Sequence, residues 1–215
     1  MIKGIIFDMD GVLVDSEPAM YKASIMGLRD YGIEAVPEDF KPFVGTGEDR
    51  FIGNVVRLYG KEYILEMKDH VYDIYCRIVD DEIILFDEIP ETLRTLKEMG
   101  LRLAVASSAD TVKVEANIRA AGIPVTLFDS MLTGSMVVRK KPDPEIFLKA
   151  AEGMGLPPEA CIVAEDATSG VRAAKAAGMH CFGITSTFGA DVLQKIGADA
   201  TGCHIRELIG FLKGQ

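Results

Sequence analysis

Two carboxylates near the start of the chain have a spacing suited to phosphoryl transfer. Asp8 and Asp10 lie two residues apart, directly after a short apolar run. The first could attack phosphorus and form an acyl phosphate, which divides one difficult displacement into two easier ones. The second could act as general acid and then as general base. The pair alone is a weak signal, because an Asp-x-Asp at a strand end more often forms a turn or a helix N-cap.

Later polar residues complete the set that this chemistry needs. Glu165 and Asp166 follow another apolar run and could contribute oxygens to a Mg2+ site. Ser107 and Ser108 follow a third run, and Lys141 lies in a Lys-Pro-Asp-Pro segment. A hydroxyl and an ammonium group could balance charge on the transferring oxygens. Each residue alone has an ordinary structural interpretation, but their joint appearance at predicted strand ends and adjoining loops favours a catalytic site.

An alternation of strand and helix patterns must position these residues. Short, apolar, β-branched segments predict five strands, at 2–7, 101–107, 127–133, 161–165 and 179–184. Amphipathic patterns predict helices between them, at 91–99, 111–121, 144–154 and 169–177. This order predicts an α/β fold with a doubly wound parallel sheet. Such sheets bind their ligands at the carboxyl ends of the strands, where the candidate residues are expected.

The stretch from 16 to 82 interrupts this alternation. It contains helix patterns at 19–31, 49–59 and 62–79 without a convincing strand between them, and glycines at positions 45 and 47 mark a loop. We therefore expect a helical cap domain, residues 16–82, inserted into a core domain formed by residues 1–15 and 83–215. The two connections near Asp15 and Ile83 are short enough to act as hinges.

Composition and charge restrict the class of partner. The 33 Asp and Glu residues outnumber the 23 Lys and Arg residues, and the formal net charge of -10 disfavours nucleic acid and anionic membranes. A bound divalent cation would let such a protein accept an anionic small molecule. The four cysteines show no zinc-site spacing, and the N-terminal apolar run is too short for a secretory signal or a membrane span. We expect a cytoplasmic monomer that binds a small phosphorylated metabolite.

These motifs resemble those of the haloacid dehalogenase superfamily over nearly the full length of the chain. Residues 8–17 are similar to its first motif, and Ser107, Lys141 and the Glu165-Asp166 pair match the second, third and fourth motifs. The resemblance implies a Rossmann-like core that carries the catalytic groups. The inserted helices are similar to the small, mobile cap of the β-phosphoglucomutase-like branch, which contributes substrate contacts.

The resemblance also implies a role for each matched carboxylate. Asp8 would be the nucleophile, and Asp10 the general acid and base. Mg2+ would be held by Asp8, the backbone carbonyl of Asp10 and Asp166, with Glu165 as a neighbouring or water-mediated ligand. The dehalogenating branch needs neither the Asp10 position nor a metal, so Asp10 and Asp166 favour phosphorus over carbon as the electrophile.

Further residues are implied to contact the substrate. Ser107 and Lys141 would bind the transferring phosphoryl oxygens, and Ser108 is a further candidate beside them. In the cap, Arg50 and Lys68 are candidate cations for the distal part of the substrate, although a lysine on a helix is more often a solvated charge.

The cap distinguishes this chain from the sugar-phosphate mutases of the same branch. Met20 lies where they have a histidine, and Glu48 lies where they have an arginine that faces a second phosphate. Without these groups, the phosphorylated enzyme should pass its phosphoryl group to water in preference to another hydroxyl. We therefore expect a phosphatase that acts on a small metabolite such as a sugar phosphate. A phosphosugar mutase and a non-catalytic binding protein on the same fold are the alternatives.

Overall fold

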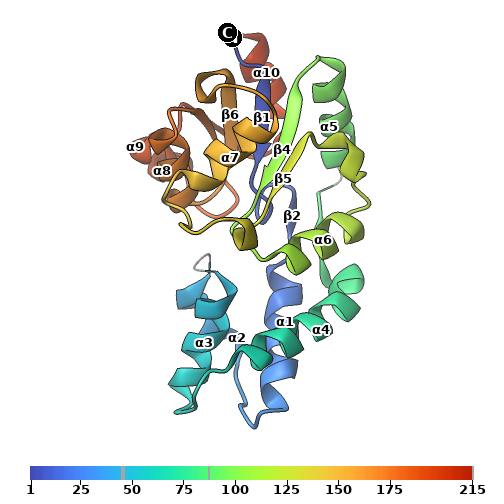
Figure 1. Ribbon diagram of the computed structural model, residues 1–215, viewed down its shortest axis with the longest axis vertical. Coiled ribbons are helices and arrows are strands. Elements are labelled where there is room, and N and C mark those ends of the chain that lie inside the picture. Colours follow the sequence, from blue (N-terminus) through green and yellow to red (C-terminus); the bar gives the residue numbers. More distant parts are fainter. Residues whose placement is uncertain (45–46, 87, 215) are drawn as a thin grey trace.

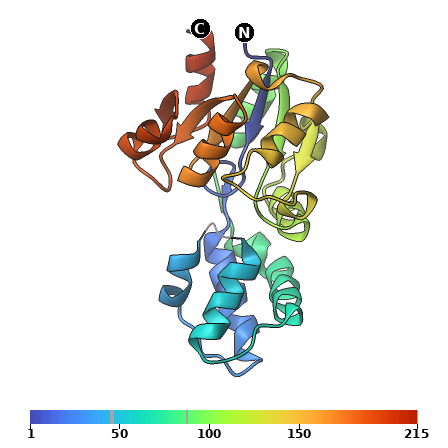
Figure 2. The same ribbon diagram turned by 60° about the vertical axis from the view of Figure 1, so that its left-hand side comes forward.

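The protein consists of a layered sheet-and-helix core with a group of helices at one end (Figure 1). The computed structural model describes residues 1–44, 47–86 and 88–214. Figure 2 shows that both termini lie at the end of the core away from that group of helices. Among the described residues, none of the helices combines the length and the apolar character needed to cross a membrane.

The described chain builds one sheet of six parallel strands in the order β5-β4-β1-β6-β7-β8. The strands are β1 (Gly4–Phe7), β4 (Arg102–Ala106), β5 (Ser130–Leu132), β6 (Cys161–Glu165), β7 (His180–Ile184) and β8 (Ala200–Gly202). All residues of β1 are buried, which explains why this strand is a continuous apolar run. β4 and β5 lie on one side of β1, and the later strands β6, β7 and β8 lie on the other. The topological switch point is therefore beside β1.

Helices cover both faces of this sheet. They are α5 (Ile89–Glu98), α6 (Thr111–Ala120), α7 (Glu145–Gly153), α8 (Thr168–Ala176), α9 (Ala190–Ile196) and α10 (Glu207–Lys213). Ile5 and Phe7 pack with residues of α5, α6 and α10 on one face, whereas Ile6 packs with residues of α7, α8 and α9 on the other. This alternation follows the two-residue period of a strand. The predicted doubly wound α/β fold is confirmed.

Four helices form a separate group that we call the helical cap: α1 (Glu17–Arg29), α2 (Pro37–Phe40), α3 (Glu48–Leu58) and α4 (Leu65–Glu82). They share a second hydrophobic core, with Phe40, Val56 and Tyr75 among its buried residues, to which Ala116 of α6 also contributes. The strands β2 (Val14–Asp15) and β3 (Ile84–Leu85) pair antiparallel where the chain enters and leaves the cap. The domain boundaries at residues 16 and 83, and a hinge motion there, stay predictions.

The structure differs from the predicted elements mainly at short segments. The expected strand at 127–133 is reduced to β5, because a 3-10 turn at Val125–Leu127 precedes it. β8, α2, α9 and α10 are too short to give a strong periodic pattern and were not predicted. Of the two loop glycines, Gly45 lies outside the described residues, and Gly47 has a positive φ of 86° immediately before α3.

Candidate active site

The carboxyl ends of three adjacent strands bring the candidate residues together. Asp8 directly follows β1, Ser107 directly follows β4, and Glu165 is the last residue of β6. The pairing register places Phe7 of β1 level with Val105 of β4 and Ala164 of β6, so the residues that follow emerge at the same edge. The Asp8 amide donates a hydrogen bond to the Ala164 carbonyl at 3.0 Å, which extends the β1–β6 ladder up to the site.

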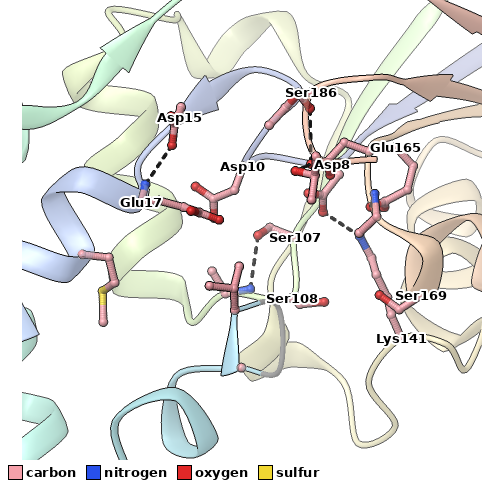
Figure 3. A pocket seen from close by; sticks show the side chains of 18 of the residues that line it. Asp8, Asp10, Asp15, Glu17, Ser107, Ser108, Lys141, Glu165, Ser169 and Ser186 are labelled. Carbon is pink, nitrogen blue, oxygen red and sulfur yellow. Dashed lines mark hydrogen bonds and ion pairs between the residues drawn. The ribbon is translucent and has the colours of Figure 1, made fainter. Parts of the chain in front are cut away.

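A cavity of about 760 Å³ lies between this edge and the helical cap. Its core side includes Asp8, Asp10, Ser107, Ser108, Lys141, Glu165 and Asp166. Its cap side includes Met20, Tyr21, Glu48 and Phe51. In Figure 3, Lys141 and Glu165 lie on one side of Asp8, and Asp10 lies on its other side. All the predicted core residues therefore face one cavity.

Lys141 connects two of the carboxylates. Its Nζ lies 2.6 Å from Asp8 Oδ1 and 2.8 Å from Glu165 Oε2, and only 4% of its side chain is exposed. Burial alone would lower the pKa of Lys141, but the negative charges of Asp8 and Glu165 outweigh it and raise that pKa above its ordinary value. The ammonium group also lies 4.8 Å from the centre of the Phe147 ring. Lys141 is therefore a cation held in place beside Asp8.

Three buried carboxylates form a cluster that could hold a metal ion. One oxygen from each of Asp8, Glu165 and Asp166 lies within 4.8 Å of the other two. Burial, followed by the charge of Glu165, raises the pKa of Asp8 to about 7. Burial, followed by the charge of Asp8, raises the pKa of Asp166 to about 7. One ammonium group therefore does not balance this cluster, and a divalent cation with oxygen ligands would.

Two glycines make room for the cluster. Gly11 has a positive φ of 76°, and a Cβ there would lie 2.2 Å from Asp166 Oδ2. Gly170, in the first turn of α8, approaches the carboxyl group of Glu165 so closely that a Cβ would lie 1.9 Å from Glu165 Cδ. Any larger side chain at either position would have to displace a carboxylate of the cluster.

Asp10 makes contacts that differ from those of the cluster. The Ser16 hydroxyl donates to Asp10 Oδ1, and Lys113 Nζ donates to Asp10 Oδ2 at 2.8 Å. Lys113 belongs to α6 and is 6% exposed, and its Nζ also lies 3.7 Å from Glu48 Oε1 in the helical cap. The Asp10 side chain is thus held between a hydroxyl and a buried ammonium group. Any metal ligand from Asp10 would therefore be its backbone carbonyl, which is the atom that we predict.

Ser107 is buried beneath the cavity, and its Oγ accepts a hydrogen bond from the Ala109 amide at 3.2 Å. The predicted cap cations lie elsewhere. Arg50 is exposed and does not line the cavity. Lys68 does not line it either, because its Nζ pairs with Asp49 at 2.9 Å and with Asp110 at 3.0 Å. The side chain of Lys68 therefore connects the cap to the start of α6, and both substrate roles remain unsupported predictions.

The sequence motifs assign no role to several residues at the site, although one of them, Glu17, lies within the first motif. Ser186 and Thr187, in the loop after β7, both donate hydrogen bonds to Asp166 Oδ2. Because they follow a predicted strand, the strand-end rule could have identified them. The sequence signals for Lys113 and Glu17 are weaker, because each lies on a helix, and the packing of that helix decides what its side chains face. Both line the cavity, and burial together with the charge of Asp15 raises the pKa of Glu17.

Comparisons with known proteins agree with this geometry. A family model described as haloacid dehalogenase-like hydrolase matches residues 2–178. The chain is 38% identical, over 97% of its length, to the protein SUPPRESSOR OF QUENCHING 1, chloroplastic, of Arabidopsis thaliana, but it spans only 20% of that relative. It is 31% identical to a phosphorylated carbohydrates phosphatase of Thermotoga maritima, over 83% of each protein.

A solved structure of CbbY from Rhodobacter sphaeroides, in complex with phosphate, superposes with a TM-score of 0.81. It is 28% identical and aligns over 97% of this chain and 96% of CbbY. The match of the family model over most of the chain, the shared fold and the motif residues gathered at one cavity lead to the same conclusion: the chain belongs to the haloacid dehalogenase-like hydrolases.

Proposed function

We propose that the protein is a Mg2+-dependent phosphatase that hydrolyses a small phosphorylated metabolite, such as a sugar phosphate, through an aspartyl-phosphate intermediate on Asp8. The observation that carries this proposal is the buried contact of Asp8 with Lys141 at 2.6 Å, beside the acidic cluster and facing the cavity. Two findings support the substrate class. One relative is named as a phosphorylated carbohydrates phosphatase, and the structure of CbbY was solved in complex with phosphate.

The residues present fit a divalent cation. The three clustered carboxylates supply the hard oxygen ligands that Mg2+ prefers, and burial, followed by the charge of a neighbouring carboxylate, raises the pKa values of Asp8 and Asp166. Asp8, Asp166 and the backbone carbonyl of Asp10 would hold the ion, with Glu165 next to it. When bound, Mg2+ would supply positive charge that stabilises the transferring phosphoryl oxygens.

The first half of the reaction forms the intermediate. A carboxylate oxygen of Asp8 attacks phosphorus and forms a new P–O bond while the P–O bond to the leaving group breaks. Asp10 donates a proton to the oxygen that leaves. Lys141 and the Ser107 hydroxyl balance negative charge on the remaining phosphoryl oxygens, and the buried position of Lys141 strengthens this interaction.

The second half releases phosphate. Asp10, now a carboxylate, takes a proton from water as the water oxygen attacks phosphorus. The bond between phosphorus and Asp8 breaks, which restores the Asp8 carboxylate and yields inorganic phosphate. The same group thus acts as acid and then as base, and the active site returns to its starting protonation state.

The cap side of the cavity favours transfer to water over transfer to a second hydroxyl. Met20, which is 4% exposed and lines the cavity, has no strong hydrogen-bonding group. Glu48 lines the cavity with a carboxylate, and burial raises its pKa while Lys113 lowers it. Lys113 already pairs with Asp10, and Lys41, which lines the cavity from the cap, lies 3.4 Å from Glu38. Because both cations already have an acidic partner, this wall offers poor support for the second phosphate of a bisphosphate intermediate.

Phosphate release from a panel of phosphomonoesters tests the proposal. The panel should include hexose and pentose phosphates and p-nitrophenyl phosphate, each with Mg2+ and with a chelator. We expect turnover of at least one ester with Mg2+, and loss of that turnover with the chelator and in Asp8→Asn. The same amide variant is the matched control, because it nearly preserves shape but cannot attack phosphorus. An Asp8→Asn enzyme that keeps most of the wild-type rate would refute the proposed route.

A further inference from the structure

We propose that Lys113 is a positioning residue that orients Asp10 for proton transfer, and that Glu48 makes this orientation depend on the helical cap. The inference rests on the proposed function, since it takes Asp10 as the general acid and base. It concerns a residue outside the motifs, on the first turn of α6, whose ammonium group contacts both the core and the cap.

Three separate segments of the chain meet at this ammonium group. Asp10 follows β1, Lys113 belongs to α6, and Glu48 is the first residue of cap helix α3. Lys113 Nζ lies 2.8 Å from Asp10 Oδ2 and 3.7 Å from Glu48 Oε1. The side chains of Lys113 and Glu48 are 8% and 9% exposed and that of Asp10 is 28% exposed, so the ammonium group itself is largely shielded from solvent. A lysine this deeply buried is stable only if anions face it.

These contacts restrict the Asp10 carboxylate from two directions. Lys113 binds one oxygen and the Ser16 hydroxyl binds the other. With a different partner on each oxygen, rotation of the carboxylate breaks at least one contact. Ser16 is fully buried and directly precedes cap helix α1, whereas Lys113 approaches from the core. Both partners are donors, so this arrangement holds in one orientation the carboxylate form of Asp10, the form that takes a proton from water.

The helix that carries Lys113 is itself attached to the cap. Tyr75 of α4 donates a hydrogen bond to Asn117 of α6, and Lys68 and Tyr72 of α4 both contact Asp110, the residue that precedes α6. Contacts with α4 thus help to fix the position of Lys113, which α6 also holds against the core, and α3 supplies its second anion. We infer that the hold on Asp10 is complete only when the cap helices occupy the arrangement seen here.

Steady-state kinetics of Lys113 variants test this role on any phosphomonoester that the enzyme hydrolyses. Lys113→Met should lower kcat by about tenfold or more while KM changes by less than about threefold, because the lost contact acts on proton transfer and not on substrate binding. Lys113→Arg, which keeps the charge, should recover most of that loss. Glu48→Gln should lower kcat less than Lys113→Met does, because Asp10 keeps its direct partner.

A double-mutant cycle identifies the route of the effect. If Lys113 acts through Asp10, Lys113→Met should cost less than about twofold in an Asp10→Asn background, because the two changes remove the same function. Equal losses in both backgrounds would overturn the inference, as would a loss confined to KM.

Folding must be checked, because Lys113→Met leaves two buried carboxylates without their cation. Circular dichroism and thermal unfolding provide that check. If Lys113→Met does not fold, the double variant Lys113→Met/Glu48→Gln replaces one of the two buried carboxylates with an amide. The kcat values of the separate variants Lys113→Arg and Glu48→Gln then still decide the inference. An unchanged kcat in Glu48→Gln would refute the dependence on the cap.

The Asp8→Asn enzyme separates this inference from the proposed function. If Asp8→Asn keeps the wild-type rate, the aspartyl-phosphate proposal itself fails. If Asp8→Asn is inactive while Lys113→Met turns over normally, only the role assigned to Lys113 fails.

Discussion

Gly170→Ala should damage the site although alanine is the better helix former. Gly170 lies in α8, where alanine is intrinsically favoured over glycine. The added Cβ would lie 1.9 Å from Glu165 Cδ and 2.0 Å from Glu165 Oε2, closer than real atoms approach. Glu165 is 1% exposed and pairs with Lys141 at 2.8 Å, so its carboxyl group cannot move aside freely. Alanine at position 170 must therefore displace one carboxylate of the cluster.

The expected magnitude follows from two opposing terms. Displacing Glu165 breaks a buried ion pair at a cost of about 3–5 kcal/mol, against about 1 kcal/mol gained from helix propensity, so the net destabilisation is about 2–4 kcal/mol. Because Lys141 also contacts Asp8, activity should fall by about tenfold or more, which corresponds to about 1.4 kcal/mol in the barrier.

Urea unfolding and phosphatase activity, measured on the same preparations, check both parts. Gly210→Ala is the matched control, since Gly210 lies in helix α10 and a Cβ there would meet none of the described atoms within 4 Å. It should be neutral or slightly stabilising and fully active. A Gly170→Ala protein as stable and as active as this control would show that Glu165 is free to move, and the reasoning would be wrong.

Three further predictions concern metal binding, stability and product. Since burial raises the pKa of Asp8 and Asp166 to about 7 in the metal-free protein, Mg2+ must displace protons, and its Kd should decrease as pH rises through 7. Titration calorimetry in buffers of different ionisation enthalpy measures this, and a Kd independent of pH would contradict it. Lys149 and the backbone N–H groups of residues 139 and 138 hold the pKa of Glu145 at about 2, below its ordinary value of 4.5. The ionised Glu145 carboxylate therefore stabilises the folded protein above pH 4.5, and this stabilisation is lost as pH falls toward 2. The Tm difference between wild type and Glu145→Gln should shrink over that range, and a constant difference would argue against this role. Supplied with β-glucose 1-phosphate and a trace of the 1,6-bisphosphate, the enzyme should release phosphate faster than it forms glucose 6-phosphate, and the reverse order would favour the mutase.

The sheet and the core of the site are predictable because they depend on local patterns. An apolar run that ends in polar residues predicts a buried strand and its carboxyl end, and adjacent parallel strands bring those ends together. Asp8, Ser107 and Glu165 therefore meet at one edge, as their positions in the sequence suggest. Short elements such as β8 carry too few residues for a comparable signal.

The cap side of the site could not be predicted in the same way. A helix pattern does not say which neighbour its polar residues will face, because that depends on how the helices pack. Arg50 and Lys68 were expected at the substrate, yet they do not line the cavity, whereas Lys113 and Glu48 meet inside it. The buried pair is evident only once the first turns of α3 and α6 are brought together.

Chemical trapping of the intermediate tests the central claim most directly. Enzyme mixed with substrate and Mg2+ is quenched within one turnover and reduced with borohydride, which converts an acyl phosphate of aspartate to homoserine. Peptide mass spectrometry then locates the modified residue. We predict homoserine at position 8 in the wild type, with none in Asp8→Asn or in the absence of substrate. Modification at another carboxylate, or rapid turnover without any trapped intermediate at position 8, would contradict the account.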